Sequence, residues 1–449
     1  MGGTKVCPFG STEKTRTMIL TALGVVKVAT AAQLRRLMAP GHATNQTILN
    51  GAKDLAAHGL VVSLGSAKSV NANGNRVTEK LWNLTPAGLE AAGVVLEREV
   101  RDMGSTAKAS VASGAPHARK VTDTITAFIQ PVPVPTKPVV RKNQPAPLPA
   151  AAPPLPPPGI GTIDAWETEV VLPVGGSFVN PVKGSLRADA VLTAPEAGLP
   201  MLCVEVDNGT EDRPRLAAKL GKYVRFYQRT VHAPGRSEIP LWTTLYEKSD
   251  REGYPPLAIV FTADVGATAM MNRMTAVRDL TRHCWRGEWN GDDMYGGTSK
   301  DGYRDHSRAL PVIVTTLARL QQHGPLGPIW WRYGHSDWET LKTALDNPDD
   351  VRAYRVRDEE RRRTEEAERE RERLAYKEKR RRREAATWPC PTCGRKTYPD
   401  DGAEAPHGDC RVCLSIKERE RREAEERAEQ EAAAKQAGFF GFLHGRKNE

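Results

Sequence analysis

The sequence predicts a multidomain protein with a mainly α-helical N-terminal domain, a central α/β domain, and C-terminal charged helices around a cysteine-based metal site. Three observations support this. Apolar residues recur at helical spacing in the first hundred residues. Strand-like and helix-like segments alternate between residues 161 and 335, which favours a sheet covered on both faces. Two Cys-x-x-Cys pairs interrupt a C-terminal region dominated by arginine and glutamate.

The length and composition indicate folded domains joined by solvated segments. A chain of 449 residues exceeds one domain, and its 33 prolines and 39% hydrophobic residues favour linkers or exposed helices. A net charge of +10 favours a polyanionic partner. The predicted segments are 13–102, 103–160, 161–335, 336–387, 388–414 and 415–449.

The sequence predicts a cytoplasmic protein that does not contact a membrane. No apolar run approaches the roughly 18–20 residues that span a bilayer, and the N-terminus lacks the apolar segment of a secretory signal. Four of the seven cysteines lie in the two Cys-x-x-Cys pairs, a pattern that suits metal binding in a reducing compartment better than a disulfide framework.

Segment 13–102 has the element order of a winged helix-turn-helix. Three apolar-periodic helices are expected, the second capped by Thr30 and the third running from Thr44 to His58. A strand LVVSL, a polar loop, a strand KLWNLT and a helix from Pro86 to Ala92 follow.

This span resembles winged-helix transcription regulators, most clearly in LWNLTPAGLEAA. The resemblance implies that the third helix enters the major groove of double-stranded DNA and that the wing touches the backbone. The candidate DNA-binding residues are Asn45, Gln46, Asn50 and Lys53 on the helix and Lys68, Arg76 and Lys80 on the wing. A winged helix that contacts protein, or serves only as a spacer, remains open.

Segment 103–160 is predicted to be a linker rich in proline and alanine. It contains a short helix, HARKVTDTITAFI, and then PVPVPTKPVVRKNQPAPLPAAAPPLPPPG. The proline-rich part favours polyproline II, so a semi-rigid spacer is expected between the flanking domains. A ligand for a proline-binding protein partner is the alternative.

The central domain carries a candidate cation site. Asp189 lies on one expected strand, Glu205 and Asp207 lie on the next, and Lys219 lies on the helix that follows. Carboxylates bind a hard divalent cation, and a nearby lysine stabilises charge on a phosphate. Solvent-facing residues on an amphipathic hairpin would give the same pattern.

Several segments of the central domain form a recognisable pattern: Trp166–Glu169, Leu186–Ala190, Val204–Glu211 (VEVDNGTE), Lys219, Tyr223, and the segments LAIVFT and GPIWW. In these segments the chain resembles the replication-relaxation family of actinobacterial plasmids and integrative elements. The resemblance covers most of residues 15–335. It implies a winged helix followed by a domain similar to restriction endonucleases of the PD-(D/E)xK type.

That resemblance also implies roles for the site residues, with Mg²⁺ as the expected cation. Asp189 and Glu205 match the two acidic motif positions, and Glu169 is an additional upstream carboxylate. Asp207 stands where the motif has lysine, and Ala188 stands where it has proline. If Lys219 reaches the carboxylates it replaces the missing lysine; otherwise the site binds a cation or DNA without cleaving.

A covalent mechanism through tyrosine also remains open from the sequence. Tyr223 and Tyr227 lie on the same expected helix as Lys219, and either hydroxyl is a candidate nucleophile for relaxase-like transesterification.

The C-terminal third contains charged helices and a candidate zinc ribbon. Oppositely charged residues at helical spacing predict a solvated helix over 336–387, whose basic end also suits phosphate contact. Cys390, Cys393, Cys410 and Cys413 have the spacing of a closed, structural Zn²⁺ site, with His407 as a substitute ligand. A charged helix and the aromatic tail GFFGFLHGRKNE, a docking segment or a frayed end, complete 415–449.

Three functions follow from these features. The first is a DNA-binding protein of a mobile element that acts in plasmid replication, relaxation or transfer and nicks DNA with a divalent cation. The second is a non-catalytic replication or transcription regulator that retains a degenerate nuclease fold. The third is an assembly adaptor in which the winged helix, the ribbon and the aromatic tail all bind protein.

Overall fold

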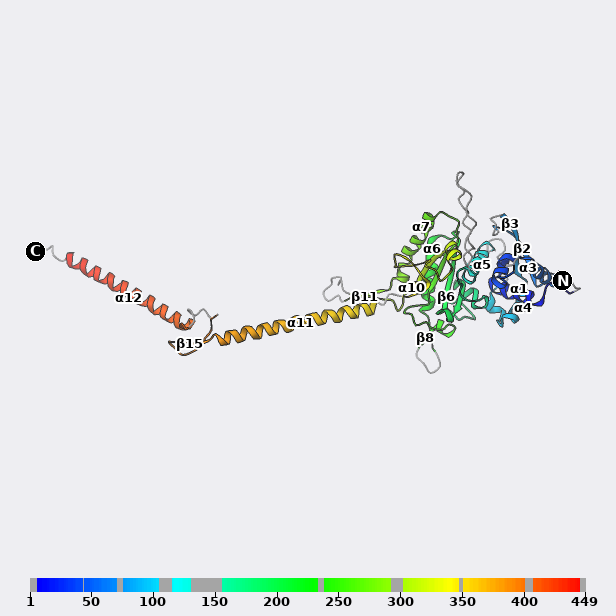
Figure 1. The fold of residues 1–449 in the computed structure, drawn as a ribbon. Coiled ribbons are helices and arrows are strands. Elements are labelled where there is room, and N and C mark those ends of the chain that lie inside the picture. The colour runs from blue at the N-terminus through cyan, green and yellow to red at the C-terminus, as the bar shows by residue number, and fades with distance from the viewer. Residues whose placement is uncertain are drawn as a thin grey trace, which may run out of the picture. The chain divides into compact units, whose positions relative to one another are not determined.

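The computed structural model describes most of the chain in two compact units, residues 1–351 and 352–449 (Figure 1). The described residues are 6–42, 44–70, 76–104, 115–130, 156–232, 238–291, 302–346, 350–399 and 407–444. No described helix is long and apolar enough to cross a membrane.

The first unit begins with helices and a small sheet in the predicted order. The helices are α1 (Glu13–Val26), α2 (Ala31–Met38), α3 (Gln46–Ala57) and α4 (Pro86–Leu96), and the strands are β1 (Val28–Thr30), β2 (Val61–Val70) and β3 (Arg76–Leu84). The strands form one sheet in the order β1-β3-β2. Threonine side chains cap α1, α2 and α4, and Thr30 forms a complete capping box with Gln33.

The hairpin of this sheet is longer than the sequence predicted. Residues 66–70 and 76–80, expected in a loop, pair in register as extensions of β2 and β3. Backbone hydrogen bonds stabilise this pairing without an apolar face. A short strand, β1, pairs with β3 and was also not expected.

Part of the predicted linker is core rather than spacer. Helix α5 (Ala115–Ile129) buries Ile125 and Phe128 completely. The Phe128 ring packs against Trp166 and Trp330, with centroids 5.2 and 5.8 Å away, and Thr122 Oγ1 donates to the Val28 carbonyl at 2.6 Å. Apolar side chains one helical turn apart therefore join the N-terminal elements to the large sheet. The proline-rich residues 131–155 lie outside the described residues.

A seven-stranded mixed sheet forms the centre of the first unit. Its order is β14-β13-β12-β9-β6-β5-β4. The strands are β4 (Trp166–Leu172), β5 (Leu186–Ala194), β6 (Leu199–Asp207), β9 (Leu257–Phe261), β12 (Val312–Thr316), β13 (Trp330–Arg332) and β14 (Trp338–Glu339). Strands β6, β9 and β12 run parallel, and the outer strands pair antiparallel.

Helices cover both faces of this sheet, as predicted. One buried cluster joins alternate strand residues such as Val204 and Val260 to α5 and the N-terminal helices. The other joins Cys203 and Ile259 to α6 (Arg213–Tyr227) and α7 (Ala267–Leu280). The remaining elements are α8 (Arg282–Trp285), α9 (Leu317–His323), α10 (Leu341–Leu345), and the hairpins β7 (Thr230–His232) with β8 (Glu238–Pro240) and β10 (Glu288–Gly291) with β11 (Gly302–Asp305).

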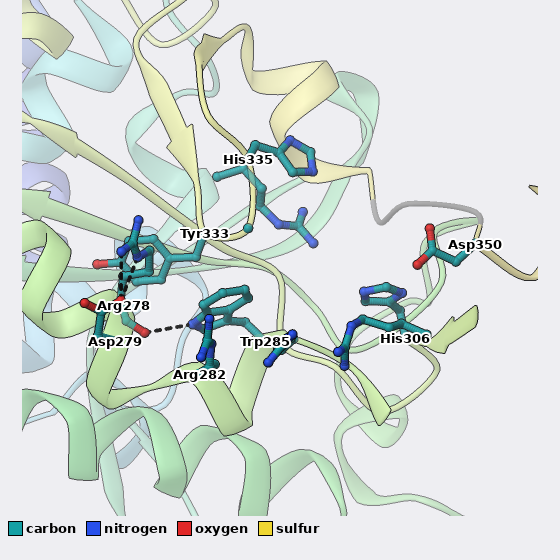
Figure 2. A pocket seen from close by; sticks show the side chains of 12 residues that line it. Arg278, Asp279, Arg282, Trp285, His306, Tyr333, His335 and Asp350 are labelled. Atoms are coloured by element: carbon teal, nitrogen blue, oxygen red, sulfur yellow. Dashed lines mark hydrogen bonds and ion pairs between the residues drawn. The ribbon is translucent and has the colours of Figure 1, made fainter. Parts of the chain in front are cut away.

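A cavity of about 450 Å³ lies where α7, α8, β11 and the turn after β13 meet (Figure 2). The α/β part also continues past residue 335, where the sequence predicted its end. Leu341, Ala344 and Leu345 are buried in its core, so the charged helix begins later than expected.

The second unit consists mainly of solvated helix. Helix α11 (Asp350–Ala385) has no buried residue among its 36, and ion pairs such as Arg363–Glu359 at 2.5 Å link successive turns. A two-stranded sheet of β15 (Trp388–Pro389) and β16 (Lys396–Thr397) precedes α12 (Arg411–His444). The side chains of the predicted aromatic tail lie outside the described residues.

Candidate functional site

Two paired strands and the next helix position the candidate cation site. Ala190 of β5 pairs with Val204 of β6, which places Asp189 and Glu205 side by side one residue further along. Helix α6 follows, with Asp212 capping its first turn by accepting from Arg215 N at 2.8 Å. Its apolar face packs on the sheet. Because Lys219 lies one turn from buried Leu216 and Tyr223, its side chain faces the same strands.

Lys219 lies between the two carboxylates. Its Nζ atom is 3.4 Å from Asp189 Oδ1 and donates a short hydrogen bond to Glu205 Oε2. The Lys219 side chain is 23% exposed, that of Asp189 is 14% exposed, and that of Glu205 only 2%. Asp189, Glu205 and Lys219, which lie on two strands and a helix, therefore form one cluster at the edge of the buried core.

Further donors satisfy the remaining carboxylate oxygens. Val206 N donates to Asp189 Oδ2 at 2.8 Å, and His117 Nε2 lies 3.3 Å from Asp189 Oδ1. The Tyr223 hydroxyl donates to Glu205 Oε1 at 2.5 Å. Each oxygen of the pair thus has at least one partner, which buried carboxylates require.

The contacts within the cluster shift the pKa values of its three members in different directions. Burial and the nearby charge of Asp189 raise the pKa of Glu205. Burial would also raise the pKa of Asp189, but the His117 hydrogen bond and the Lys219 charge outweigh it and lower that pKa. Burial opposes the charge on Lys219, whereas the two carboxylates outweigh it and raise the lysine pKa. Glu205 is therefore the carboxyl that most readily takes up a proton.

Asp207 and Glu169, the other two predicted carboxylates, interact with residues outside this cluster. Asp207 is bound by Arg273, whose Nη2 donates to Oδ1 at 2.9 Å while Nε donates to Oδ2. Glu169 has a left-handed backbone (φ 54°) and interacts with Arg187 at 3.3 Å. The structure brings Asp189, Glu205 and Lys219 together but engages Asp207 and Glu169 elsewhere.

The predicted Mg²⁺ site has only two protein carboxylates. Within the described ranges, no third histidine or carboxylate joins Asp189 and Glu205 in a compact group of three. Mg²⁺ commonly takes one or two protein carboxylates and keeps several waters, a requirement that the pair meets in number only. An ion at this position would compete with the Lys219 ammonium for the same oxygens.

The tyrosine alternative is not supported by the geometry. Tyr223 and Tyr227 are almost completely buried, and burial raises the pKa of each hydroxyl well above its ordinary value. A nucleophile requires an accessible oxygen and a readily lost proton. Tyr223 instead positions Glu205.

Sequence reasoning missed His117 and Arg273 as members of this neighbourhood. His117 lies in the segment assigned to the linker, and no local motif marks it. Arg273 lies on α7, 66 positions after Asp207. Their contacts depend on how distant elements pack, although the amphipathic spacing of Val121, Ile125 and Phe128 does indicate that α5 has a buried face.

The predicted DNA-binding residues fall into two groups. On α3, Gln46 Nε2 donates to Asn50 Oδ1 at 2.7 Å, and Asn45 Oδ1 accepts from Arg35 Nε at 2.8 Å. Lys53 lies 5.3 Å from the centre of the Phe9 ring. Gln46 is the exposed member of this group.

The hairpin residues share one exposed face. Lys68 pairs with Thr78, and Arg76 and Lys80 flank Thr78 at two-residue spacing. Paired residues, and residues two apart, point to the same side of a sheet. Lys68, Arg76 and Lys80 therefore present three exposed cations on one side of the hairpin.

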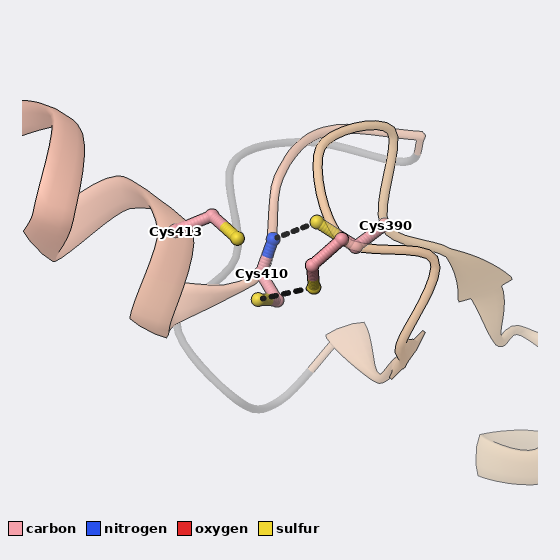
Figure 3. Close-up of side chains that lie close together, drawn as sticks. Cys390, Cys410 and Cys413 are labelled. Atoms are coloured by element: carbon pink, nitrogen blue, oxygen red, sulfur yellow. Dashed lines mark hydrogen bonds between the residues drawn. The ribbon is translucent and has the colours of Figure 1, made fainter.

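The four paired cysteines of the second unit form a compact group (Figure 3). All four sulfur atoms lie within 4.8 Å of one another, and Cys393 Sγ is 3.8 Å from Cys410 Sγ. A tetrahedral zinc–thiolate site, with bonds of about 2.3 Å, separates its sulfurs by about 3.8 Å. The group can therefore bind a metal such as zinc.

Polar contacts around Cys390 suit a thiolate, whereas the hydrogen bond to Cys393 raises the pKa of Cys413. Cys410 N donates to Cys390 Sγ at 3.3 Å. Burial would raise the pKa of Cys390, but backbone hydrogen bonds from Cys410 and Cys393 outweigh it and lower the pKa to about 7. His407 has a left-handed backbone, and its ring lies 6.2 Å from that of Trp388, tilted by 51°, rather than joining the sulfur group.

The fold and site define a mixed α/β protein with a buried carboxylate–lysine cluster and a separate four-cysteine group. Residues 20–241 match the family model described as replication-relaxation. This match supports the predicted replication-relaxation family and suggests involvement in plasmid replication or relaxation. No curated protein and no solved structure matches the chain.

Proposed function

We propose that this protein binds double-stranded DNA during plasmid replication or relaxation and nicks one strand with a divalent cation. One observation carries the catalytic part: Lys219 Nζ lies between Asp189 and Glu205. This is the arrangement in which a lysine from the following helix replaces the one absent at position 207.

In this proposal the N-terminal elements act as a winged helix. The exposed face of α3 enters the major groove, where Gln46 and Asn50 read base edges. The basic face of the β2–β3 hairpin contacts phosphate through Lys68, Arg76 and Lys80. The +10 net charge favours the same partner.

The α/β part acts as the nuclease-like domain. Asp189 and Glu205 would hold Mg²⁺, and the chemistry that the ion would supply there is polarisation of the scissile phosphate and a lower pKa of a bound water. Lys219 moves its charge from the carboxylates toward the phosphate and stabilises the developing negative charge. His117 keeps Asp189 ionised and oriented, and Tyr223 holds Glu205.

A non-catalytic regulator is the second candidate, and a specific observation favours it. Every oxygen of Asp189 and Glu205 already has a partner, and Glu205 is 2% exposed. A fully satisfied ion cluster can stabilise a fold without chemistry. In that case the α/β part is a scaffold for DNA binding.

The four-cysteine group acts as a structural zinc site in either case. Four thiolates leave no open position for substrate. Zinc would order the short β15–β16 segment between two charged helices that have little core of their own.

The test uses supercoiled plasmid with Mg²⁺ and measures nicked product beside a gel shift. The variants are Asp189→Asn, Glu205→Gln and Lys219→Met. Lys222→Met is the matched control, because Lys222 lies on the same helix but donates to the Gly184 carbonyl. The proposal expects the three cluster variants to lose nicking and keep the gel shift, with the control active.

Two other results would redirect the conclusion. If the plasmid stays intact with the wild type as well as with every variant, and the gel shift is salt-sensitive, the protein is the non-catalytic regulator. No gel shift at any salt concentration would exclude both DNA-binding functions and favour a protein adaptor, because phosphate binding is necessarily salt-dependent.

A further inference from the structure

A cavity whose charged lining residues are mainly arginines lies outside residues 20–241, the span that matches the family model. Its volume is about 450 Å³, within the range of small-molecule sites. Five arginines line it, against two aspartates: the arginines are Arg278, Arg282, Arg286, Arg304 and Arg332. Figure 2 shows the labelled side chains on separate elements, with Arg282 close to Trp285 and with His306 and Asp350 near each other at the right of the view.

Two of these arginines have uncompensated charge in the described part of the chain. Arg282 and Arg286 are exposed, and within the described ranges neither side chain has a hydrogen bond or ion pair. Asp279, by contrast, pairs with Arg278, its Oδ1 lying 2.8 Å from Arg278 Nη2. Asp350 is the second aspartate. Five guanidinium groups against two carboxylates leave the cavity with excess positive charge, which raises the energy of the free site, and a bound anion relieves it.

Arg304 lies near Arg282 and Arg286, and their charges affect its pKa. Arg304 Nη1 donates to the Gly287 carbonyl at 3.2 Å, and its guanidinium lies 5.6 Å from the centre of the Trp289 ring. Burial and the positive charges of Arg286 and Arg282 lower the pKa of Arg304. Its guanidinium stays protonated at neutral pH, so the cavity keeps its positive charge.

A buried histidine borders the cavity. His306 lines it at 5% exposure, and its imidazole lies close to the Arg304 backbone. Burial lowers the pKa of His306. The positive charge of the cavity at neutral pH therefore comes from its arginines.

Aromatic side chains complete the lining. Trp285 Nε1 donates to the Arg278 carbonyl at 3.2 Å, which holds the indole in place. The Tyr333 ring lies 6.1 Å from it, centre to centre. Arginine forks match phosphate oxygens. Because Trp285 is only 9% exposed and Tyr333 only 2%, the arginines rather than base stacking would provide most of the recognition.

We propose that this cavity binds the phosphate groups of a nucleotide, either free or at the end of a nucleic-acid strand. Arg282 and Arg286 contact the phosphate oxygens, and Trp285 borders the nucleoside. The site shares no residue with the Asp189–Glu205–Lys219 cluster. A protein that does not nick DNA could therefore still bind a nucleotide in this cavity.

The experiment measures binding to the full-length protein by fluorescence anisotropy. The probes are labelled adenosine triphosphate and a labelled hexadeoxynucleotide with or without a 5′-phosphate. The test variant is the double substitution Arg282→Gln and Arg286→Gln, since both side chains are exposed and unpaired in the described structure. The control is Lys183→Gln with Arg225→Gln, which removes the same charge from exposed positions elsewhere.

We expect the double variant to bind at least about tenfold more weakly than wild type, the loss of about one charge-assisted hydrogen bond. The control should bind as wild type does. Preference for the triphosphate identifies a free nucleotide, and preference for the 5′-phosphorylated strand identifies a strand end. The proposal is overturned if wild type binds no probe, or if the test and control variants lose equal affinity.

Discussion

Replacing Lys219 with methionine tests the carboxylate–lysine cluster most directly. Methionine keeps much of the side-chain length and removes the charge. It leaves Asp189 and Glu205 side by side, with Glu205 2% exposed. His117 and Val206 N still support Asp189, and Tyr223 still donates to Glu205.

The expected cost follows from this geometry. Removing one partner of a buried ion pair typically destabilises a protein by about 3–5 kcal/mol. Lys219 retains 23% exposure, and Glu205 can take up a proton in response. We therefore expect about 2–4 kcal/mol at pH 8, or a fall in melting temperature of about 3–5 °C for the unit of residues 1–351.

The loss of stability in Lys219→Met should depend on pH. The pKa of Glu205 is raised above its ordinary value of 4.5, so the folded state binds the proton more tightly than the unfolded state. Stability is then lost as the pH rises from about 4.5 through the folded-state pKa. Without the Lys219 charge that pKa rises further, so the deficit of the variant grows with pH.

Melting temperature, followed by tryptophan fluorescence at pH 5 and pH 8, checks this result. Adding Glu205→Gln to Lys219→Met removes the unpaired charge and should recover most of the loss at pH 8. Lys222→Met should change stability by less than about 1 kcal/mol. A Lys219→Met deficit that is equal at both pH values, or unaffected by Glu205→Gln, would refute the proposed charge coupling.

The remaining predictions concern the metal group, the hairpin and the histidine. The purified protein should contain about one zinc per chain, and Cys410→Ser should lower this content, as measured by a chromogenic chelator. Lys68→Ala and Lys80→Ala should each weaken DNA binding for all sequences and reduce the salt slope by about one, as measured by titrations at several salt concentrations. The Asp189 hydrogen bond raises the pKa of His117, so its imidazole should titrate above 6.5 by NMR and return toward that value in Asp189→Asn. The stability that His117 contributes should be present below pH 6.5 and lost as the pH rises through its folded-state pKa.

Local features of the N-terminal part could be predicted because short-range chemistry decides them. Thr30 caps α2, and Pro86 opens α4, where the sequence placed these boundaries. The ends of β2 and β3 were missed because the pairing of 66–70 with 76–80 depends on cross-strand backbone bonds rather than on an apolar pattern.

The candidate site was predictable in part. The positions of Asp189, Glu205 and Lys219 followed from strand, turn and helix spacing, since these elements are neighbours in sequence. The partner of Asp207 could not be predicted, because Arg273 reaches it from α7, across the parallel pairing of β6 with β9. The contribution of His117 depends likewise on the docking of α5.

The sequence by itself determined the family, the alternation of strands and helices in the centre, and the two-plus-two cysteine spacing. These depend on residue type and on separations of a few positions. Only the tertiary structure decided that Lys219 lies between the two carboxylates, that Asp207 is neutralised by Arg273, and that five arginines surround one cavity. Such contacts join residues far apart in the chain, and the packing of whole elements, rather than local propensity, sets their distances.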